Sequence, residues 1–218
     1  MPDFTIVLGN KRYSSWSLRG WLMLKQGGGA FDEIVIPLDQ PQTRSEILSH
    51  SPAGKVPVLK TGDSVVWDSL AIAEYLHEAF PEAGLWPSDA GARAQARSIS
   101  AEMHAGFAAL RMHLPMDVCA QNPSRGARAL SDPQVAADVA RIVAIWTGCR
   151  ERYGGGDFLF GDWCAADAMY APVATRMTTY AVPLQGPAAA YRKAVMAFPA
   201  MAEWIAAARD EPWVIDQD

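Results

Sequence analysis

Hydrophobic residues in the first third of the chain alternate between the spacing of strands and the spacing of helices. Strand-like apolar runs occupy about residues 4–8, 31–37, 56–60 and 64–67, and helix-like runs occupy about 15–24, 43–49 and 68–79. The last of these runs places its apolar residues on one stripe, which is typical of a helix packed on a core. The order β-α-β-α-β-β-α predicts a mixed-sheet α/β unit.

The remainder of the chain carries helical signals only. A connector punctuated by Pro81, Gly84, Pro87 and Gly91 separates the two parts. Beyond it, the predicted helices cover about residues 89–120, 132–153, 165–180, 187–197 and 199–209. The sequence therefore predicts an α/β domain over residues 1–80, followed by an all-helical domain over residues 88–218.

Composition and charge narrow the class of protein. Half of the 218 residues are apolar, and 19 basic against 24 acidic side chains give a net charge of −5. No basic run marks a nucleic-acid partner, and no apolar run is long enough to span a bilayer, so we expect neither nucleic acid nor membrane as a partner.

The cysteines and histidines point to neither disulfides nor a metal. Cys119, Cys149 and Cys164 are odd in number and far apart, which argues against a disulfide framework. His104 and His113 lack metal-ligand spacing, so no metal is expected. Since no secretory signal is visible either, we expect a cytoplasmic protein.

Small hydroxyl side chains stand where the first strand hands over to the first helix, in Tyr13-Ser14-Ser15-Trp16-Ser17-Leu18-Arg19. A helix N-terminus carries unpaired N–H groups and a partial positive charge, so it favours a bound anion. A serine there either caps the helix or turns its hydroxyl toward a ligand. The residues alone leave both interpretations open.

Two further segments allow a structural and a functional interpretation. A cis peptide before Pro57 would leave the backbone N–H and C=O of Val56 free for an extended ligand, whereas a trans proline would merely start a strand. Asp68 and Ser69 are ordinary helix caps. In the functional interpretation Ser69 and the helix N-terminus bind an anion, and Asp68 receives an ammonium group.

Taken together and in this order, the three segments resemble the glutathione S-transferase family, and the likeness covers essentially the whole chain. Within the family, the first segment resembles zeta-like serine transferases and related bacterial proteins. The resemblance implies a thioredoxin-like N-terminal domain, an all-helical C-terminal domain, a homodimer, and glutathione as co-substrate without a metal.

The resemblance also implies how glutathione would be held. Ser14 or Ser15 would donate a hydrogen bond to its sulfur. The zeta-like pattern favours Ser14, which we prefer, whereas counting back from Arg19 as in theta-like members favours Ser15. Together with the helix N-terminus, this hydrogen bond would lower the thiol pKa by around two units.

The remaining glutathione contacts follow from the same resemblance. The backbone of Val56, ahead of a cis Pro57, would hold the cysteinyl part, and Lys55 would reach the glycine carboxylate. Asp68 and Ser69 would hold the γ-glutamyl end.

Candidates for the second-substrate pocket lie mostly beyond the connector. His104, Phe107 and Arg111 share one face of the predicted helix 89–120, where they either line the pocket or pack between the domains. By resemblance to zeta-like isomerases, Arg176 would read a substrate carboxylate. Trp16 stands where the zeta pattern has cysteine, and it would form a wall of the pocket or of the core.

The segment 161–167 resembles the buried helix-capping segment of the family. Cys164 stands where the family has Ser or Thr, three residues before Asp167. Because a thiol caps poorly, we expect Asp167 to find its partners among backbone N–H groups. Arg19 is expected to pack the first helix against the second domain or the dimer partner, and Tyr13 is a competing thiolate stabiliser.

The sequence thus predicts a glutathione transferase, with detoxification as the implied role. The bound thiolate attacks a small electrophile that lies in a cleft between the domains. One alternative is a glutathione-dependent cis–trans isomerase of the maleylacetoacetate or maleylpyruvate type. The other is a non-catalytic binding or regulatory protein on the same scaffold.

Overall fold

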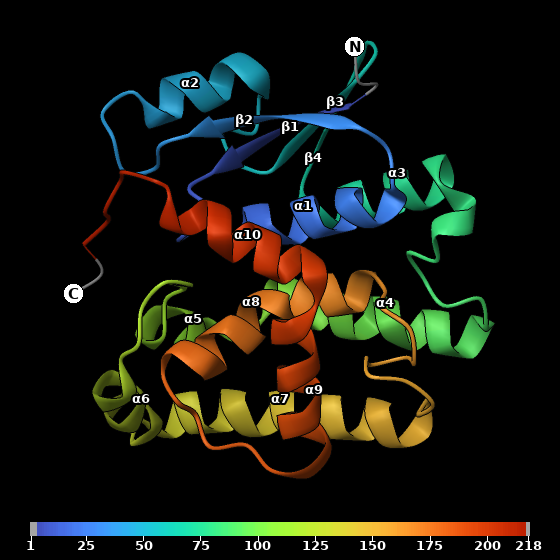
Figure 1. Cartoon of the computed structure of the whole chain (residues 1–218), viewed down its shortest axis with the longest axis vertical. Coiled ribbons are helices and arrows are strands. Elements are labelled where there is room, and N and C mark those ends of the chain that lie inside the picture. Colours follow the sequence, from blue (N-terminus) through green and yellow to red (C-terminus); the bar gives the residue numbers. More distant parts are fainter. Residues whose placement is uncertain (1–3, 217–218) are drawn as a thin grey trace.

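The computed structural model describes residues 4–216, which form an α/β layer stacked on a helical layer (Figure 1). The elements of the first layer are, in chain order, β1 (Phe4–Gly9), α1 (Ser15–Gly27), β2 (Phe31–Ile36), α2 (Thr43–His50), β3 (Val58–Thr61), β4 (Ser64–Trp67) and α3 (Ser69–Ala79). The strands form one sheet in the order β2-β1-β3-β4, in which β1 is parallel to β2 and β3 is antiparallel to its neighbours. The predicted mixed-sheet α/β unit is confirmed.

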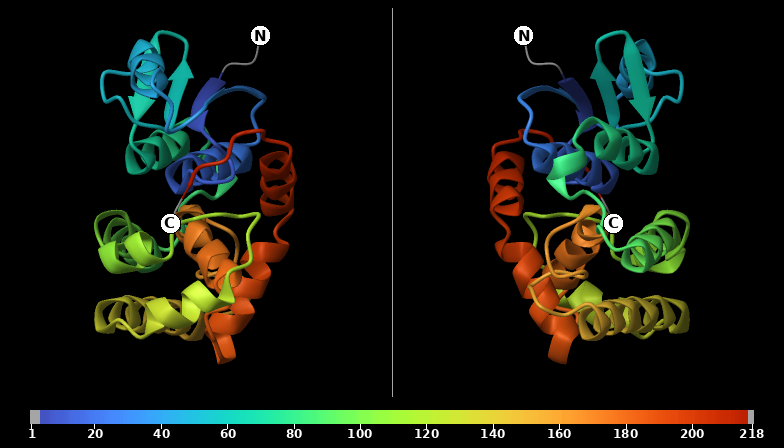
Figure 2. Two further views of the ribbon diagram at one scale, coloured as in Figure 1. Left: turned by 90° about the vertical axis from the view of Figure 1, so that its left-hand side faces the viewer. Right: turned by 90° about the vertical axis from the view of Figure 1, so that its right-hand side faces the viewer.

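The central strand β1 is apolar on both faces because helices cover both faces of the sheet. Ile6 and Leu8 join the large core shared with α1 and α3, whereas Val7 points into a smaller cluster with Ile47 of α2. This alternation follows the two-residue period of a strand. Figures 1 and 2 show α2 on one side of the sheet and the pair α1 and α3 on the other.

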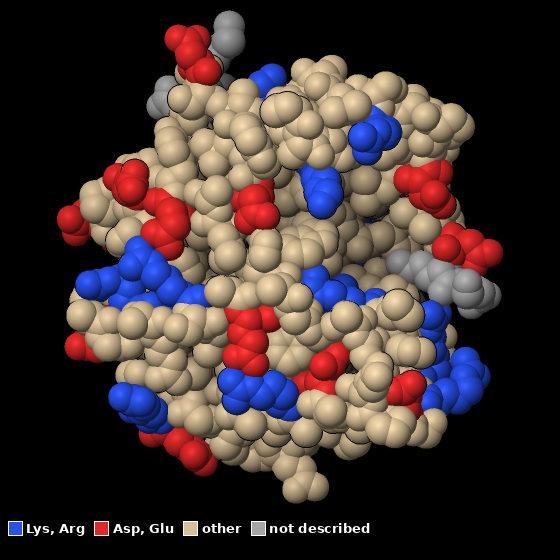
Figure 3. All heavy atoms as spheres, turned by 180° about the vertical axis from the view of Figure 1, so that it is seen from behind, with Lys and Arg blue, Asp and Glu red and all other residues tan. Residues whose placement is uncertain are grey.

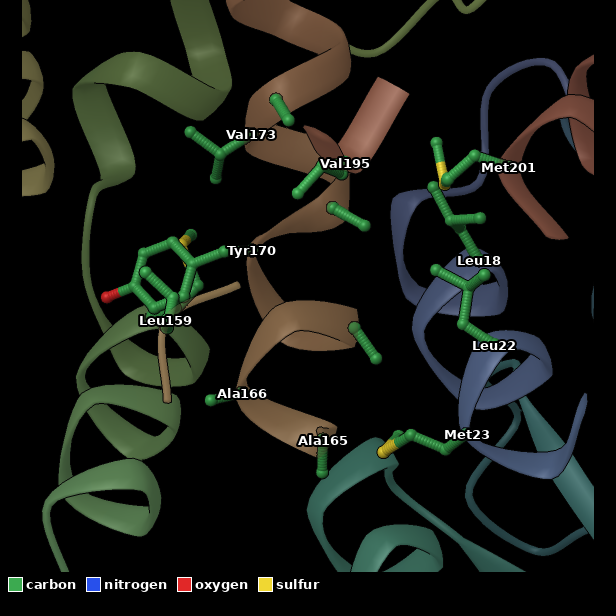
Figure 4. Packing of buried hydrophobic residues seen from close by; sticks show 14 of the residues in the cluster. Leu18, Leu22, Met23, Leu159, Ala165, Ala166, Tyr170, Val173, Val195 and Met201 are labelled. Atoms are coloured by element: carbon green, nitrogen blue, oxygen red, sulfur yellow. The ribbon is translucent and has the colours of Figure 1, made fainter. Parts of the chain in front are cut away.

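The second layer is helical. Its elements are η1 (Pro81–Ala83), α4 (Ala90–Ala105), α5 (Ala108–His113), α6 (Pro123–Leu130), α7 (Pro133–Arg152), α8 (Ala165–Thr179), α9 (Gly186–Ala197) and α10 (Pro199–Arg209). Helix α8 is buried almost all round, and its buried residues include the polar side chains of Asp167, Thr175 and Arg176. Figure 4 shows Leu18 and Leu22 of α1 and Met201 of α10 in one cluster beside it, so the large core continues from one layer into the other.

The single helix predicted over residues 89–120 is wrong. Helix α4 ends at Ala105, and Phe107 adopts a left-handed φ of 60° before α5 begins at Ala108. The Phe107 ring is buried in the large core, so its burial competes with continuation of the helix. His104, Phe107 and Arg111 therefore do not share one helix face.

Two other boundaries differ from prediction. Strand β3 begins at Val58 rather than at Val56. The unpredicted helix α6 starts at Pro123, where the Asn122 side chain accepts a hydrogen bond from the N–H of Arg125. The predicted domain limits, 1–80 and 88–218, stay a prediction. Within residues 4–216, no helix combines the length and apolarity needed to cross a membrane.

Candidate functional site

A cavity of about 700 Å³ opens at the edge of the α/β layer, beside the C-terminal end of α4. Figure 3 shows a hollow between the two layers on the face opposite to that of Figure 1. The cavity brings together all three segments that the sequence singles out. Its lining residues are Tyr13, Ser14, Ser15, Trp16, Leu38, Ile47, Ala53, Gly54, Lys55, Val56, Pro57, Trp67, Asp68, Ser69, His104 and Ala105.

The Val56–Pro57 peptide bond is cis, which confirms the alternative that would present backbone groups to a ligand. Strand pairing begins only at Val58, opposite Trp67. Across the described residues, the N–H and C=O of Val56 have no hydrogen-bond partner. A side chain at Gly20 would meet the Pro57 ring at 2.8 Å, so the glycine lets α1 pack closely behind the cavity.

The two candidate hydroxyls lie at the start of α1. Ser14 is the N-cap, and its Oγ accepts a hydrogen bond from the N–H of Ser17 at 3.3 Å. The hydroxyls of Ser14 and Ser17 are also 2.7 Å apart. Ser15 is the first residue of the helix, and no described residue hydrogen-bonds to its hydroxyl. Both Ser14 and Ser15 line the cavity, so each can face a ligand at the positive end of the helix.

The N-terminus of α3 has features that capping alone does not explain. The Asp68 side chain accepts a hydrogen bond from the N–H of Leu70 at 2.9 Å, which is ordinary capping. However, Asp68 has a φ of 74°, a left-handed conformation that costs about 1–3 kcal/mol for a residue other than glycine. Ser69 is 1% exposed, and its buried hydroxyl has no partner in the described part of the chain. An unpaired buried hydroxyl costs about 1–3 kcal/mol unless a ligand satisfies it.

Trp16 and His104 form the wall of the cavity nearest the helical layer. Their rings are 5.0 Å apart and nearly perpendicular. The Nε2 atom of His104 lies 3.3 Å from the second carboxylate oxygen of Asp68. Burial lowers the pKa of His104 against the opposing effect of Asp68, and the positive charges of Arg19 and Arg111 lower it further.

Phe107, Arg111 and Arg176 lie outside the lining of this cavity. Arg111 donates hydrogen bonds to the carbonyls of Met103 and Gly106 at the end of α4, and its guanidinium lies 4.9 Å from the centre of the Trp16 ring. Arg176 is buried and donates to the carbonyl of Leu114 at 2.8 Å. Burial lowers its pKa to about 10, and the charge of Arg111 acts in the same direction.

Arg19 is fully buried between the two layers, as expected of a residue that packs the first helix against the helical part. Its Nε donates to the carbonyl of Met169 in α8 at 3.1 Å, and its guanidinium lies 4.3 Å from the centre of the Trp16 ring. Burial lowers its pKa, and so do the charges of Arg111 and Arg176. Positive charge is therefore concentrated behind Trp16.

Sequence reasoning did not find two features of this site. It gave no role to Ser17, although Ser17 stands inside the quoted segment, and it did not link His104 to Asp68. The contact between His104 and Asp68 joins the end of α4 to the start of α3, and no local sequence pattern predicts such a contact. Within the described residues, no cluster of three or more His, Cys, Asp or Glu is arranged to hold a metal ion.

The capping segment before α8 is closed rather than open. The two carboxylate oxygens of Asp167 accept hydrogen bonds from the N–H groups of Cys164, at 2.9 Å, and Leu159, at 3.1 Å. The prediction that Asp167 finds backbone partners is confirmed. Burial raises the pKa of Asp167 to about 6, although both N–H groups favour the ionised form.

Comparison with known proteins places this architecture in a family. Residues 13–79 match the family described as "Glutathione S-transferase, N-terminal domain". A probable maleylacetoacetate isomerase of Caenorhabditis elegans is 36% identical over 93 residues, which cover 43% of this chain and 42% of that protein. Glutathione S-transferase 1 of Dianthus caryophyllus is 55% identical over 81 residues, which cover 37% of this chain and 36% of that protein. The chain thus matches less than half the length of each of these two relatives.

Similarity of structure extends over nearly the whole chain. A glutathione transferase homolog from Burkholderia, crystallised with bound glutathione, superimposes with a TM-score of 0.70 at 25% identity, covering 97% of this chain and 100% of that one. Residues 13–79 therefore match the N-terminal domain of the glutathione S-transferase family, and the chain as a whole has the fold of a glutathione transferase homolog. It has the thioredoxin-like N-terminal domain and the all-helical C-terminal domain that the resemblance implied.

Proposed function

We propose that the protein is a glutathione transferase that binds glutathione in this cavity and activates its thiol for attack on a small electrophile. The observation that carries the proposal is the set of unused polar groups in the lining of the cavity. The lining includes the backbone of Val56, the buried hydroxyl of Ser69 and the hydroxyl of Ser15, none of which has a partner among the described residues.

The polar groups suit an extended tripeptide. The cysteinyl part would pair with the backbone of Val56, as a further strand pairs with a sheet edge. The γ-glutamyl carboxylate would take the Ser69 hydroxyl and the N-terminus of α3, and its ammonium group would lie against Asp68. Lys55, which is exposed at the rim, would reach the glycine carboxylate.

This placement brings the sulfur to the start of α1, where Ser14 and Ser15 lie. A free thiol has a pKa near 8.5 and is mostly protonated at pH 7. A charge-assisted hydrogen bond contributes about 1.5–3 kcal/mol and a helix N-terminus up to about 2 kcal/mol, which together favour the thiolate. The thiolate then forms a C–S bond, and either a leaving group departs with its electron pair or a double bond takes up a proton.

A second candidate function is cis–trans isomerisation of a small dicarboxylate. The thiolate would add to a double bond, the new single bond would rotate, and expulsion of the thiolate would restore the double bond without net redox change. The positive charge of Arg19 and Arg111 against Trp16, with Arg176 close enough to lower the pKa of Arg19, favours an anionic second substrate. Isomerisation is the second candidate because none of these three guanidinium groups lines the cavity.

The proposal is tested by titrating the thiolate absorbance of bound glutathione in the wild type and in Ser14→Ala and Ser15→Ala. We expect a bound thiol pKa about two units below that of free glutathione, raised by removal of the hydroxyl that contacts the sulfur. A bound thiol that titrates like the free one would instead indicate a non-catalytic binding protein. Turnover of aromatic halides against maleyl substrates then separates transferase from isomerase.

The homodimer and the cytoplasmic location belong to the same proposal. Light scattering of the purified protein tests the first, and fractionation of cells that express it tests the second.

A further inference from the structure

We infer that Ser17 is a positioning residue that fixes the direction of the Ser14 hydroxyl proton, so that Ser14 rather than Ser15 donates to the glutathione sulfur. The inference rests on the proposed function, and it names a residue beyond the predicted glutathione contacts. It arises from a chain of hydrogen bonds behind the cavity that joins the end of β1 to the start of α1.

The chain begins at a backbone group whose polarity is fixed. The N–H of Gly9 donates to the Oγ of Ser17 at 2.9 Å, and Ser17 is fully buried. The Ser17 hydroxyl lies 2.7 Å from the Ser14 hydroxyl. The N–H of Ser17 also reaches the Oγ of Ser14, at 3.3 Å. Ser14, at the other end of the chain, lines the cavity.

Counting protons then sets the direction of the central hydrogen bond. A hydroxyl has one proton to donate and two lone pairs to accept with. Ser17 already accepts from Gly9, and among the hydrogen bonds of the described residues its hydroxyl has one other partner, the hydroxyl of Ser14. If Ser17 donates, Ser14 accepts from both the hydroxyl and the N–H of Ser17. Both acceptor positions of Ser14 are then filled, and only its proton remains to face the cavity.

The opposite direction is unfavourable on two counts. If Ser14 donated to Ser17, the Ser17 proton would stay buried without an acceptor, and burial of an unsatisfied donor is costly. Ser14 would also turn a lone pair toward the thiolate. A negatively charged sulfur therefore selects the arrangement in which the chain runs from Gly9 through Ser17 to Ser14. Each donor in such a chain polarises the next.

Ser15 has no comparable support. No described group hydrogen-bonds to its hydroxyl, so its proton rotates freely and must be ordered when the ligand binds. Donors that are oriented beforehand stabilise a charge better than donors that must reorganise. The hydrogen-bonded hydroxyl of Ser14 is therefore the better thiolate partner, even though the hydroxyl of Ser15 is the one without a partner.

A pair of nearly isosteric variants tests the inference. Ser17→Thr keeps a hydroxyl at this position, whereas Ser17→Val has a similar shape and none. We expect Ser17→Val to raise the pKa of the bound glutathione thiol by about one unit relative to Ser17→Thr. Both variants add a methyl group in the same place, so this comparison separates the hydroxyl from the effect of packing.

A double-mutant cycle shows whether Ser17 acts through Ser14. In a Ser14→Ala background, the Thr and Val variants should give the same thiol pKa, whereas in a Ser15→Ala background the difference of about one unit should persist. Should the methyl group prevent folding, Ser17→Ala against the wild type replaces the pair. Thermal melts then report separately the destabilisation caused by the unpaired Gly9 N–H.

Three outcomes overturn the inference. The Thr and Val variants titrate alike in the wild-type background, or their difference survives in Ser14→Ala, or it vanishes in Ser15→Ala. In these cases the proposed function stands, because the wild type still lowers the thiol pKa. A wild type that binds glutathione without lowering its thiol pKa would reject the proposed function and the inference together.

Discussion

Carboxylates accept backbone N–H groups at the start of several helices in the described part of the chain, and two of them have opposite surroundings: Asp68, the N-cap of α3, and Asp167, in the first turn of α8. Asp68 at α3 uses one oxygen to accept the N–H of Leu70, and its other oxygen stands at a cavity, 3.3 Å from His104. Asp167 at α8 is fully buried, and backbone N–H groups take both of its oxygens. A carboxylate that accepts backbone N–H groups is therefore part of a candidate ligand site at α3. At α8 the same kind of group is buried and only supports the fold, so we call the Asp167 carboxylate and its backbone partners the buried cap.

A second residue at each helix start, Ser69 at α3 and the N-cap Cys164 at α8, shows the same contrast. The Ser69 hydroxyl, next to Asp68, is buried without a partner in the described residues, although nothing in capping requires it to be left so. Cys164 supplies both a carbonyl that accepts from the N–H of Asp167 and an N–H that donates to its carboxylate. A candidate ligand site is therefore distinguished from a structural cap by unpaired hydrogen-bonding groups next to a cavity, and not by the presence of a cap.

The largest expected effect on stability comes from removing the carboxylate of the buried cap. Asp167→Ala would leave two buried backbone N–H groups without acceptors and should lower the free energy of unfolding by about 3 kcal/mol or more. Urea denaturation measures this loss. The matched change at the other helix, Asp68→Ala, should cost only about 1 kcal/mol because that N-terminus is open to solvent. Equal losses at the two positions would abolish the contrast.

The pH dependence of stability should differ in the same way. The native pKa of Asp167 is raised to about 6, above its usual 3.8. The protonated carboxyl is thus favoured in the folded state, and the stability it contributes is complete below about pH 4 and lost as the pH rises through about 6. The loss is of the order of 2–3 kcal/mol.

Asp167→Asn isolates this contribution, because an amide does not titrate. Urea midpoints of the variant and the wild type, measured between pH 4 and pH 7.5, should diverge as the wild type loses stability. Parallel curves would mean that the two backbone N–H groups compensate fully for the burial of the charge.

The local chemistry of both helix starts could be predicted from the sequence, and the contacts between distant elements could not. The cap at Asp68 follows from residue types at fixed spacing, whereas the cis peptide at Pro57 and the backbone partners of Asp167 were expected only with the help of the family resemblance. The break at Phe107 does not follow from local residue types, because the helical pattern continues through it and the buried ring that favours the break packs in the core.

The same limit explains the parts of the site that were missed. His104 contacts Asp68 because the C-terminal end of α4 lies beside the N-terminal end of α3 in space. This contact depends on how the two layers pack against each other. The role of Ser17 depends on the Gly9 N–H, which the fold brings to its hydroxyl. In contrast, Asn122-Pro123 was a readable helix start, since an N-cap residue before a proline is a frequent opening.

At the open site, Ser69→Ala should separate binding from folding. We expect the dissociation constant for glutathione to rise at least tenfold, because a hydrogen bond to a charged carboxylate contributes about 1.5–3 kcal/mol. The melting temperature without glutathione should stay unchanged or rise slightly, because the hydroxyl lost has no partner to lose. Calorimetric titration and thermal melts measure the two quantities. A destabilised variant with unchanged affinity would show that this hydroxyl serves the fold.

The smallest expected effect is a gain in stability at the buried cap. Cys164→Ser replaces a thiol with a hydroxyl that accepts the N–H of Asp167 more strongly, and N-cap substitutions of this kind change stability by about 0.5–1 kcal/mol. Cys164 is only 3% exposed, so the gain competes with the cost of burying a more polar atom. Thermal melts compare this variant with Cys119→Ser, which alters a cysteine outside any helix start. If Cys164→Ser stabilises the protein and Cys119→Ser does not, the stronger capping hydrogen bond outweighs the cost of burying the hydroxyl. If Cys164→Ser destabilises the protein, the packing of the thiol contributes more than capping does.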